Sequence, residues 1–298
     1  MNLFDLHCDT IYECTTKHKD LKENDLHLDL NRGIAATDKW VQTFAFWIAD
    51  DLTEEEQYCS YQRQLSCFRT FSEQYSELAP YHGEAENSKC RYLLSIEGGS
   101  AIGGDLDRIR AFREDGIRML TLTWNGENRI GGGAQSTQGL TSFGKDVIRE
   151  LEAQQITVDV SHLNRKTFFD VCKIAEKPFV ATHSNAFRIC GHPRNLDDDQ
   201  IKELAECGGL IGLNLFCDFL SSEKDCKMED FIRHIEYFLS CGAEQNLAIG
   251  TDFDGAKMPK WIKGIESLEI LFQNVVKYFG EQISRQIFFE NAARFFSA

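Results

Sequence analysis

The sequence predicts an α/β fold, a (β/α)8 TIM-like barrel with its active site at the C-terminal ends of the strands. Eight short apolar runs alternate with stretches of helical periodicity along the 298 residues. Most of these runs are apolar throughout, as the strands of a parallel sheet covered by helices require. Eight βα units in this length are typical of a barrel. The expected strands are residues 3–7, 40–48, 91–96, 117–123, 156–160, 178–182, 210–215 and 247–251.

The first third of the chain contains the longest expected helix. Residues 40–48 are rich in aromatic and β-branched side chains and predict a strand. Thr53 follows, with Glu56 three residues later, which is the pattern of a capping box. Apolar side chains then recur at helical spacing, so we expect a helix from Thr53 toward Leu78. The polar segment 82–89 is expected to be a loop.

After residue 90, strands and helices alternate regularly, and glycines mark several helix ends. Gly116 and Gly242 each follow a helical stretch and precede the next strand. The glycine-rich segment 124–139 is expected to be a loop. The expected helices are residues 105–114, 142–154, 164–175, 197–204, 228–239, 265–278 and 281–296.

A doubly wound sheet is the alternative fold for such a pattern. It is disfavoured because no G-x-G-x-x-G follows an early strand. The glycines at 131–133 lack a following lysine, so they do not predict a phosphate-binding loop. No linker, low-complexity tract or repeat divides the chain, and we expect one domain over residues 1–298.

Composition excludes several classes of partner. The formal net charge of -15 disfavours nucleic acid and anionic membranes as partners. No apolar run approaches the roughly 20 residues that span a bilayer, and no basic segment followed by an apolar one opens the chain. The 11 cysteines include no C-x-x-C pair. Scattered thiols of this kind fit a reducing compartment, so we expect a cytoplasmic protein whose cysteines are mostly core residues.

The first expected strand ends in a histidine and an aspartate two positions apart. His7 and Asp9 would share one side of the strand because side chains alternate with period two. An imidazole and a carboxylate on one side form half of a divalent metal site. By itself, His-x-Asp is more often a turn in which the aspartate caps the next helix.

Five strand ends considered together favour a metal site over a helix cap. His7 and Asp9, Glu97, His162, His183 and Asp252 each follow an expected strand. In a barrel, the C-terminal strand ends converge on one face. Histidine and carboxylate ligands without thiolate suit zinc or a similar divalent ion, and a glutamate among them can bridge two ions.

The chain resembles the membrane (renal) dipeptidase family of metallopeptidases, among the amidohydrolase-like barrels. The similarity runs nearly the whole length of the chain in the family's order. The residues that carry it are His7-x-Asp9, Ser95-Ile96-Glu97-Gly98-Gly99, Leu120-Thr121-Leu122-Thr123, Asp159-Val160-Ser161-His162, Thr182-His183-Ser184-Asn185-Ala186, Arg194-Asn195, Asp252-Phe253-Asp254-Gly255 and residues 291–294.

The resemblance implies a binuclear site with two Zn²⁺ per chain. His7 and Asp9 would bind one ion, His162 and His183 the other, and Glu97 would bridge them. A bridging water or hydroxide would be the nucleophile. Asp252 would be the proton shuttle, and Arg194 would hold the carboxylate of the substrate. Homodimer formation is also an expectation from the family.

Two positions depart from the mammalian pattern of that family. Trp124 stands where a histidine contacts the substrate carbonyl, and Phe216 replaces a tyrosine. Loss of a polar donor at either position would change substrate choice or slow turnover. Asn125 or Asn128 is a candidate replacement donor, although asparagine in a turn is the commoner explanation.

Two further residues near the expected site have competing interpretations. His192 lies close to Arg194 in the sequence, and it either lines the site or belongs to a solvated loop. Cys8, between two expected ligands, should face the opposite side and belong to the core.

Three functions remain after these observations. The first is a zinc-dependent dipeptidase that hydrolyses the peptide bond of dipeptides with a zinc-activated hydroxide. The second is an amidohydrolase acting on another small amide, such as an N-acyl amino acid or a lactam, and Trp124 and Phe216 motivate it. The third is a barrel that binds metal or a partner without turnover. Asp252 argues against the third, because a non-catalytic site needs no proton shuttle.

Overall fold

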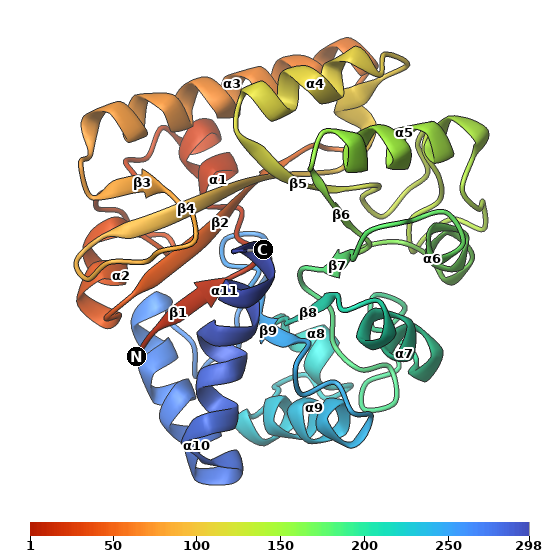
Figure 1. Cartoon of the computed structure of the whole chain (residues 1–298). Helices are drawn as coiled ribbons and strands as arrows, with labels where there is room; N and C mark the ends of the chain where they lie inside the picture. Colours follow the sequence, from red (N-terminus) through yellow and green to blue (C-terminus); the bar gives the residue numbers. More distant parts are fainter. Residues whose placement is uncertain (298) are drawn as a thin grey trace.

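A computed structural model describes residues 1–297, and its strands form one parallel sheet closed into a barrel (Figure 1). β2 (Trp40–Trp47) pairs with β1 (Leu3–Asp5) on one side and with β4 (Cys90–Glu97) on the other, which closes the sheet. The barrel continues through β5 (Ile117–Thr121), β6 (Thr157–Asp159), β7 (Val180–Ala181), β8 (Leu210–Leu213) and β9 (Leu247–Ile249), which pairs with β1. The predicted eight-stranded α/β barrel is confirmed.

An additional short strand, β3 (Leu78–Pro80), lies outside the barrel and was not predicted. It pairs with the first residues of β4, whereas β5 pairs with β4 only from Leu94 onward. The helix predicted to run toward Leu78 is therefore too long. The backbone leaves the helical region at Tyr75, whose φ is −114°. The tyrosine hydroxyl is bonded to Asp20, and the chain turns into the strand.

The helices cover the outside of the barrel, as βαβ connections require. α3 (Glu54–Gln74) begins with the predicted capping box, in which Thr53 and Glu56 satisfy each other's backbone N–H groups. Helices follow strands in the predicted order around the barrel (Figure 1). They are α4 (Asp107–Glu114), α5 (Ser142–Ala153), α6 (Arg165–Cys172), α7 (Asp198–Glu206), α9 (Met228–Ser240), α10 (Leu268–Arg285) and α11 (Asn291–Phe296).

Three short helices were not predicted. They are α1 (Thr10–Lys17), α2 (Leu30–Ala36) and α8 (Cys217–Leu220). None reaches the length at which hydrophobic periodicity identifies a helix. At the C-terminal end, Gly280 has a φ of +82° and interrupts α10, and residues Gln286–Glu290 form a π-helical turn before α11.

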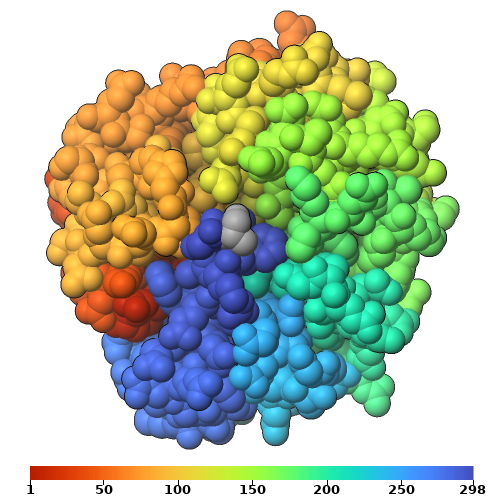
Figure 2. Space-filling view, viewed as in Figure 1, coloured from red at the N-terminus to blue at the C-terminus, as the bar shows by residue number. Residues whose placement is uncertain are grey.

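Apolar side chains and the C-terminal helix close the barrel at the N-terminal ends of its strands. One buried cluster draws members from strands all round the barrel, including Phe4, Val41 and Val180, together with Ala292 and Phe296 of α11. Figure 1 shows α11 lying across this end, and Figure 2 shows the C-terminal segment in the middle of the same face. A larger cluster packs the barrel against its helices.

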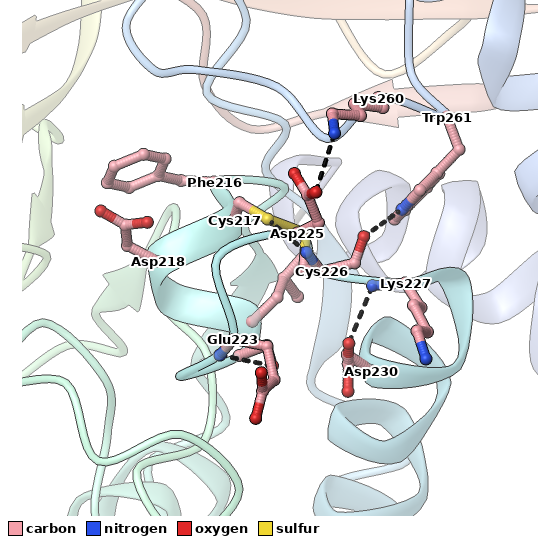
Figure 3. The surroundings of a disulfide bond; sticks show 12 residues. Phe216, Cys217, Asp218, Glu223, Asp225, Cys226, Lys227, Asp230, Lys260 and Trp261 are labelled. Atoms are coloured by element: carbon pink, nitrogen blue, oxygen red, sulfur yellow. Dashed lines mark hydrogen bonds and ion pairs between the residues drawn. A yellow bond between two sulfur atoms is a disulfide. The ribbon is translucent and has the colours of Figure 1, made fainter.

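Two cysteines differ from the expectation of free thiols. Cys217 and Cys226 form a disulfide, with their Cα atoms 5.5 Å apart (Figure 3). Their spacing of nine residues matches no pattern that identifies a disulfide from sequence. The other cysteines are free, and several, such as Cys14 and Cys90, are buried core residues as predicted. Within residues 1–297, no helix combines the length and apolar character that crossing a bilayer requires.

Candidate metal centre and substrate pocket

Strand register brings the candidate residues to one level of the barrel. Trp47, the last residue of β2, is paired with Glu97 at the end of β4. Glu97 is paired in turn with Thr121, and Thr121 with Asp159. Side chains that follow these strands therefore meet above the apolar interior, at the C-terminal mouth of the barrel.

Glu97 lies at the centre of the buried cluster, and its two carboxylate oxygens face different histidines. Oε1 lies 2.8 Å from Nε2 of His162 and 3.4 Å from Nε2 of His183. Oε2 lies 3.5 Å from Nε2 of His7. A carboxylate divided in this way has the arrangement of a ligand that bridges two ions.

His7 joins this group to a second set of carboxylates. Its Nε2 lies 3.4 Å from Oδ2 of Asp9. Ligand atoms of His7, Asp9 and Asp252 all lie within 4.8 Å of one another, and so do those of His7, Glu97 and His183. These residues come from four different strand ends, so the barrel and not local sequence brings them together.

Buried atoms without partners show that the cluster fits a divalent ion. Nε2 of His7 and Oδ1 of Asp9 are buried and make no hydrogen bond, although buried polar atoms almost always have a partner. Asp9 occupies the position before α1, yet its side chain makes no capping bond. The alternative that Asp9 serves as a helix cap is therefore not supported. Imidazole and carboxylate donors of this type suit zinc-like ions.

Outer hydrogen bonds orient the two histidines on the other side of Glu97. Nδ1 of His183 lies 2.8 Å from Oγ1 of Thr182, and Nδ1 of His162 lies 2.9 Å from Oδ1 of Asn125. Buried Asp159 accepts hydrogen bonds from Thr182 below them. Such contacts fix the tautomer and direct Nε2 into the centre.

Backbone strain is concentrated at this centre. His162, Asp252 and Asp254 have φ values of +69°, +61° and +68°, in the left-handed region that few non-glycine residues adopt. Gly255 follows, and a Cβ there would collide with Oδ2 of Asp9 and lie 2.6 Å from Oδ1 of Asp252. The turn 252–255 therefore needs a glycine to approach the carboxylates closely.

Burial raises the pKa values of two carboxyl groups in the centre. Burial is the largest cause for Asp252, whose pKa rises to about 6, while His7 opposes the rise and Glu97 adds to it. Burial and the charge of Glu97 raise the pKa of Asp9 to about 8. An Asn214 side-chain amide donates to Oδ2 of Asp252 at 2.9 Å and fixes its orientation.

The histidines divide into two electrostatic types. Burial lowers the pKa of His162 to about 4 and takes the pKa of His183 well below its ordinary value. Both are therefore neutral at physiological pH, the form that binds metal ions. For His7, burial lowers the pKa, but the charges of Glu97 and Asp9 outweigh burial and raise it well above its ordinary value.

A cavity of about 620 Å³ opens above the centre. Glu97, His162 and Asp252 form part of its lining, and the buried Arg194 reaches it from the loop after β7. The guanidinium of Arg194 donates to the backbone oxygen of His183 at 3.2 Å, whereas its Nε has no partner. Burial lowers the pKa of Arg194 to about 10, so the group remains a cation.

Trp124, Phe216 and His192 also line this cavity. His192 therefore lines the pocket, although Gly191 and Pro193 on either side of it are exposed. Cys8 points away from the cavity, as expected, and its thiol contacts the backbone oxygen of Thr43 at 3.4 Å.

Several pocket residues were missed by sequence reasoning. Tyr12, Trp47 and Phe219 line the pocket but carry no motif, and neither does Asn214, which is buried behind Asp252; asparagines and aromatic residues are common elsewhere in the chain. Trp47 lies one residue before the end of the expected strand 40–48, and the strand-end rule that selected Glu97 would have come close to it.

A TIM-like barrel with a buried histidine and glutamate cluster at its mouth defines the class of metal-dependent hydrolases of the barrel type. The family model "Membrane dipeptidase (Peptidase family M19)" matches residues 1–298. The chain belongs to this metallopeptidase family.

Related sequences and structures agree with the assignment. A protein of Klebsiella pneumoniae, described as an uncharacterized protein in the pqqA 5' region, is 34% identical over 64% of this chain and 77% of its own length. An uncharacterized dipeptidase of Schizosaccharomyces pombe is 28% identical over 61% of this chain, which spans about half (45%) of that relative.

Solved structures show the same fold. A dipeptidase of family M19 superposes with a TM-score of 0.92 at 24% identity over 100% of this chain and 99% of its own. A metallopeptidase from Rhodobacter sphaeroides, liganded with a phosphinate mimic of the dipeptide L-Ala-D-Ala, superposes with a TM-score of 0.91 at 23% identity over 99% of this chain and 98% of its own.

Proposed function

We propose that this protein is a zinc-dependent dipeptidase with a binuclear centre. The observation that carries the proposal is the division of the Glu97 carboxylate, with one oxygen toward His7 and the other toward His162 and His183. Asp9 would complete the first set of ligands. When bound, the two ions would polarise the scissile carbonyl and lower the pKa of a water molecule.

Asp252 is the proposed acid and base of the reaction. Its pKa of about 6 lies near neutrality, where a group both accepts and releases protons efficiently. The Asp252 carboxylate would take the proton from the attacking water and pass it to the nitrogen of the leaving amine as the C–N bond breaks. Asn214 would hold the carboxylate at the correct angle throughout.

Arg194 is the proposed carboxylate-binding group. Its Nε is buried without a partner in the pocket wall, and the planar guanidinium matches a carboxylate with two parallel hydrogen bonds. The dipeptide mimic bound to the Rhodobacter sphaeroides metallopeptidase supports a substrate of this size and kind.

A second candidate substrate is another small amide, such as an N-acyl amino acid or a lactam. Trp124 favours it, because an indole stands in the pocket wall where the family pattern has a histidine that contacts the carbonyl. A barrel that binds metal or a partner without turnover is disfavoured by the orientation and shifted pKa of Asp252.

Metal analysis and a kinetic screen test the proposal. Zinc-reconstituted protein is expected to hold about two ions per chain and to hydrolyse members of a panel of L-L and L-D dipeptides. Asp252→Asn should lower kcat by about 10²–10⁴-fold with the metal content retained. Asp146→Asn, at an exposed aspartate on α5, is the matched control. Faster cleavage of N-acyl amino acids than of every dipeptide would favour the second candidate, and zinc-loaded protein inert toward both panels would leave the non-catalytic barrel.

Location and assembly stay predictions. The prediction of a cytoplasmic location rests on the many free thiols. The Cys217–Cys226 disulfide does not fit the reducing compartment that this prediction assumes. Cell fractionation tests the location, and thiol labelling of the fractionated protein tests whether Cys217 and Cys226 are oxidised. The homodimer is an expectation from the family, which sedimentation of the purified protein tests.

A further inference from the structure

Three aromatic side chains, here called the first wall, line one side of the pocket. They are Tyr12 on α1, Trp47 at the end of β2 and Trp124 after β5. The ring centres of Tyr12 and Trp47 are 4.8 Å apart, and those of Trp47 and Trp124 are 5.2 Å apart, with both pairs packed edge to face. The centre of the Trp124 ring lies 6.2 Å from that of His162, one of the candidate metal ligands. The first wall is therefore a row of neighbouring aromatic rings along the pocket that runs from Tyr12 to Trp124.

Hydrogen bonds and close packing fix the loop that carries Trp124. The backbone N–H of Gly126 donates to Oδ2 of Asp50 at 2.7 Å, and Asn125 is bonded to His162. A Cβ on Gly133 would collide with the backbone oxygen of Trp124, so the two segments of the loop are in direct contact. Because these contacts already order the Trp124 loop, binding of a ligand against the first wall loses little further conformational entropy.

A second wall is formed by Phe216, Phe219 and His192. The phenylalanine rings are 4.9 Å apart, and the ring of His192 is 4.5 Å from that of Phe219. The Arg194 guanidinium lies 5.4 Å from the centre of the Phe219 ring. The pocket's proposed carboxylate-binding group therefore lies beside the second wall.

The two walls lie on opposite sides of the barrel mouth. The first wall follows β1, β2 and β5, whereas the second follows β7 and β8, and the strand order separates these groups around the barrel. If Arg194 binds the C-terminal carboxylate of a dipeptide, the C-terminal residue lies beside the second wall. The scissile bond lies over Glu97, and the N-terminal side chain then faces the first wall.

We propose that Trp47 and Trp124 form a subsite for a large apolar N-terminal side chain, so that the preferred substrates are dipeptides beginning with residues such as leucine or phenylalanine. The inference rests on the proposed dipeptidase function. Glu13, the one acidic side chain of α1, is paired with Lys17, so this helix offers the first wall no unpaired carboxylate. Apolar contact alone supplies selectivity of about 10–200-fold for each added group of methylene size.

A substrate series tests the assignment with zinc-reconstituted protein. The measured quantity is the ratio of kcat/KM for Leu-Ala or Phe-Ala to that for Gly-Ala. Wild-type protein is expected to give a ratio of at least about ten. The ratio should fall about ten-fold in Trp124→Ala and be largely kept in Trp124→Phe. Tyr278→Ala, an aromatic truncation at an exposed position of α10, is the matched control and should leave the ratio unchanged.

Reversed dipeptides and a binding measurement separate the two proposals. Ala-Leu against Ala-Gly reports on the second wall, and its ratio should not respond to Trp124→Ala. Binding of Leu-Ala and Gly-Ala to metal-free protein, followed by tryptophan fluorescence, measures selectivity without hydrolysis. Tighter binding of Leu-Ala in a protein that hydrolyses no dipeptide would support the subsite and contradict the dipeptidase. Equal kcat/KM across the series, equal binding of Leu-Ala and Gly-Ala, or a preference for Asp-Ala or Glu-Ala would overturn the subsite. A protein that neither binds nor cleaves any dipeptide would contradict both the subsite and the dipeptidase function.

Discussion

The side chain of Asn214 connects Asp252 to the pocket wall. Its amide nitrogen donates to Oδ2 of Asp252 at 2.9 Å, and its oxygen accepts a hydrogen bond from the backbone N–H of Phe216 at 2.5 Å. One asparagine therefore fixes both the proposed proton carrier and the start of α8. The next residues, Cys217 to Leu220, form that helix.

Asn214→Ala removes the bond to Asp252 and should lower kcat. We expect a decrease of about 10–100-fold, as for other groups that orient a functional side chain without touching substrate. In the wild type, the hydrogen bond from Asn214 stabilises the charged carboxylate and lowers the pKa of Asp252. Without this bond the pKa should rise, and the acidic limb of the pH–rate profile should move to higher pH. Asn274→Ala, on the surface of α10, is the control. An unchanged profile would show that Asn214 does not act on Asp252.

Gly255→Ala should disrupt the metal centre. The new Cβ would collide with Oδ2 of Asp9, so this carboxylate or the turn 252–255 must shift. We expect loss of bound zinc in equilibrium dialysis, together with loss of activity. Gly104→Ala is the matched control, because a Cβ there meets only the Arg129 guanidinium, at 3.7 Å. Full zinc occupancy in Gly255→Ala would contradict the role of this close approach.

Removal of metal by a chelator should lower the melting temperature, and zinc should restore it. A ligand that binds only the folded state at 1,000 times its Kd stabilises by about 4 kcal/mol. Glu97→Ala should reduce this zinc-dependent shift, because both sets of histidines lose their shared carboxylate. Glu73→Ala, at an exposed position of α3, should keep the full shift in the same calorimetric scan. A melting temperature independent of zinc would count against the centre.

Replacing Cys217 and Cys226 by serine should destabilise the protein by about 2–3 kcal/mol, since the disulfide closes a short loop in the unfolded chain. The loop is also held by the bond from the Trp261 indole to the Cys226 oxygen and by the Lys260–Asp225 ion pair (Figure 3). Unfolding by urea measures the change. The double variant Cys59→Ser and Cys241→Ser removes two exposed free thiols and should have little effect. Equal stability of the two double variants would exclude a stabilising disulfide.

Stability should fall as the pH drops from 6.5 toward 4, in part because of His234. Burial lowers the pKa of His234 to about 4, and its Nδ1 accepts the backbone N–H of Ala186 at 3.1 Å. In the unfolded chain the His234 imidazole takes up a proton near pH 6.5, whereas in the folded protein it stays neutral down to about pH 4. The contribution of neutral His234 to the free energy of unfolding is therefore complete above pH 6.5. It amounts to about 3 kcal/mol and is lost as the pH approaches 4.

The variant His234→Gln separates this contribution from those of other histidines. It should be less stable than wild type at pH 7, and the difference in the free energy of unfolding should shrink at pH 5. Urea titrations at both pH values measure it. A difference that is constant with pH would assign the effect to packing and not to protonation.

The barrel was predictable because its signals are local and repeated. Continuous apolar runs such as 40–48 and glycines such as Gly116 mark strands and helix ends without knowledge of the partners. The short elements were not predictable, because they depend on contacts with distant parts of the chain and not on local signals. β3 exists because β4 offers it an edge, and α8 is held by the Cys217–Cys226 bond and by the bond from His234 to the Leu220 oxygen.

The candidate metal residues were predictable from their strand-end positions, and their roles stay predictions. What the sequence could not provide was the set of supporting contacts. Asn214 reaches Asp252 across 38 positions, and Asn125 reaches His162 across 37. Neither asparagine has a spacing or neighbour that distinguishes it from the asparagines that form turns.

The apolar filling of the barrel and helix α11 also determine how molecules move through the protein. In the part of the chain that the structure describes, Phe4, Val180 and Phe296 belong to a buried apolar cluster that fills the barrel on the side away from the metal centre. Whatever the pocket binds must enter and depart by the same mouth. The two fragments of a cleaved molecule would therefore compete with incoming substrate for that exit, and the fragment held by Arg194 should be the last to leave.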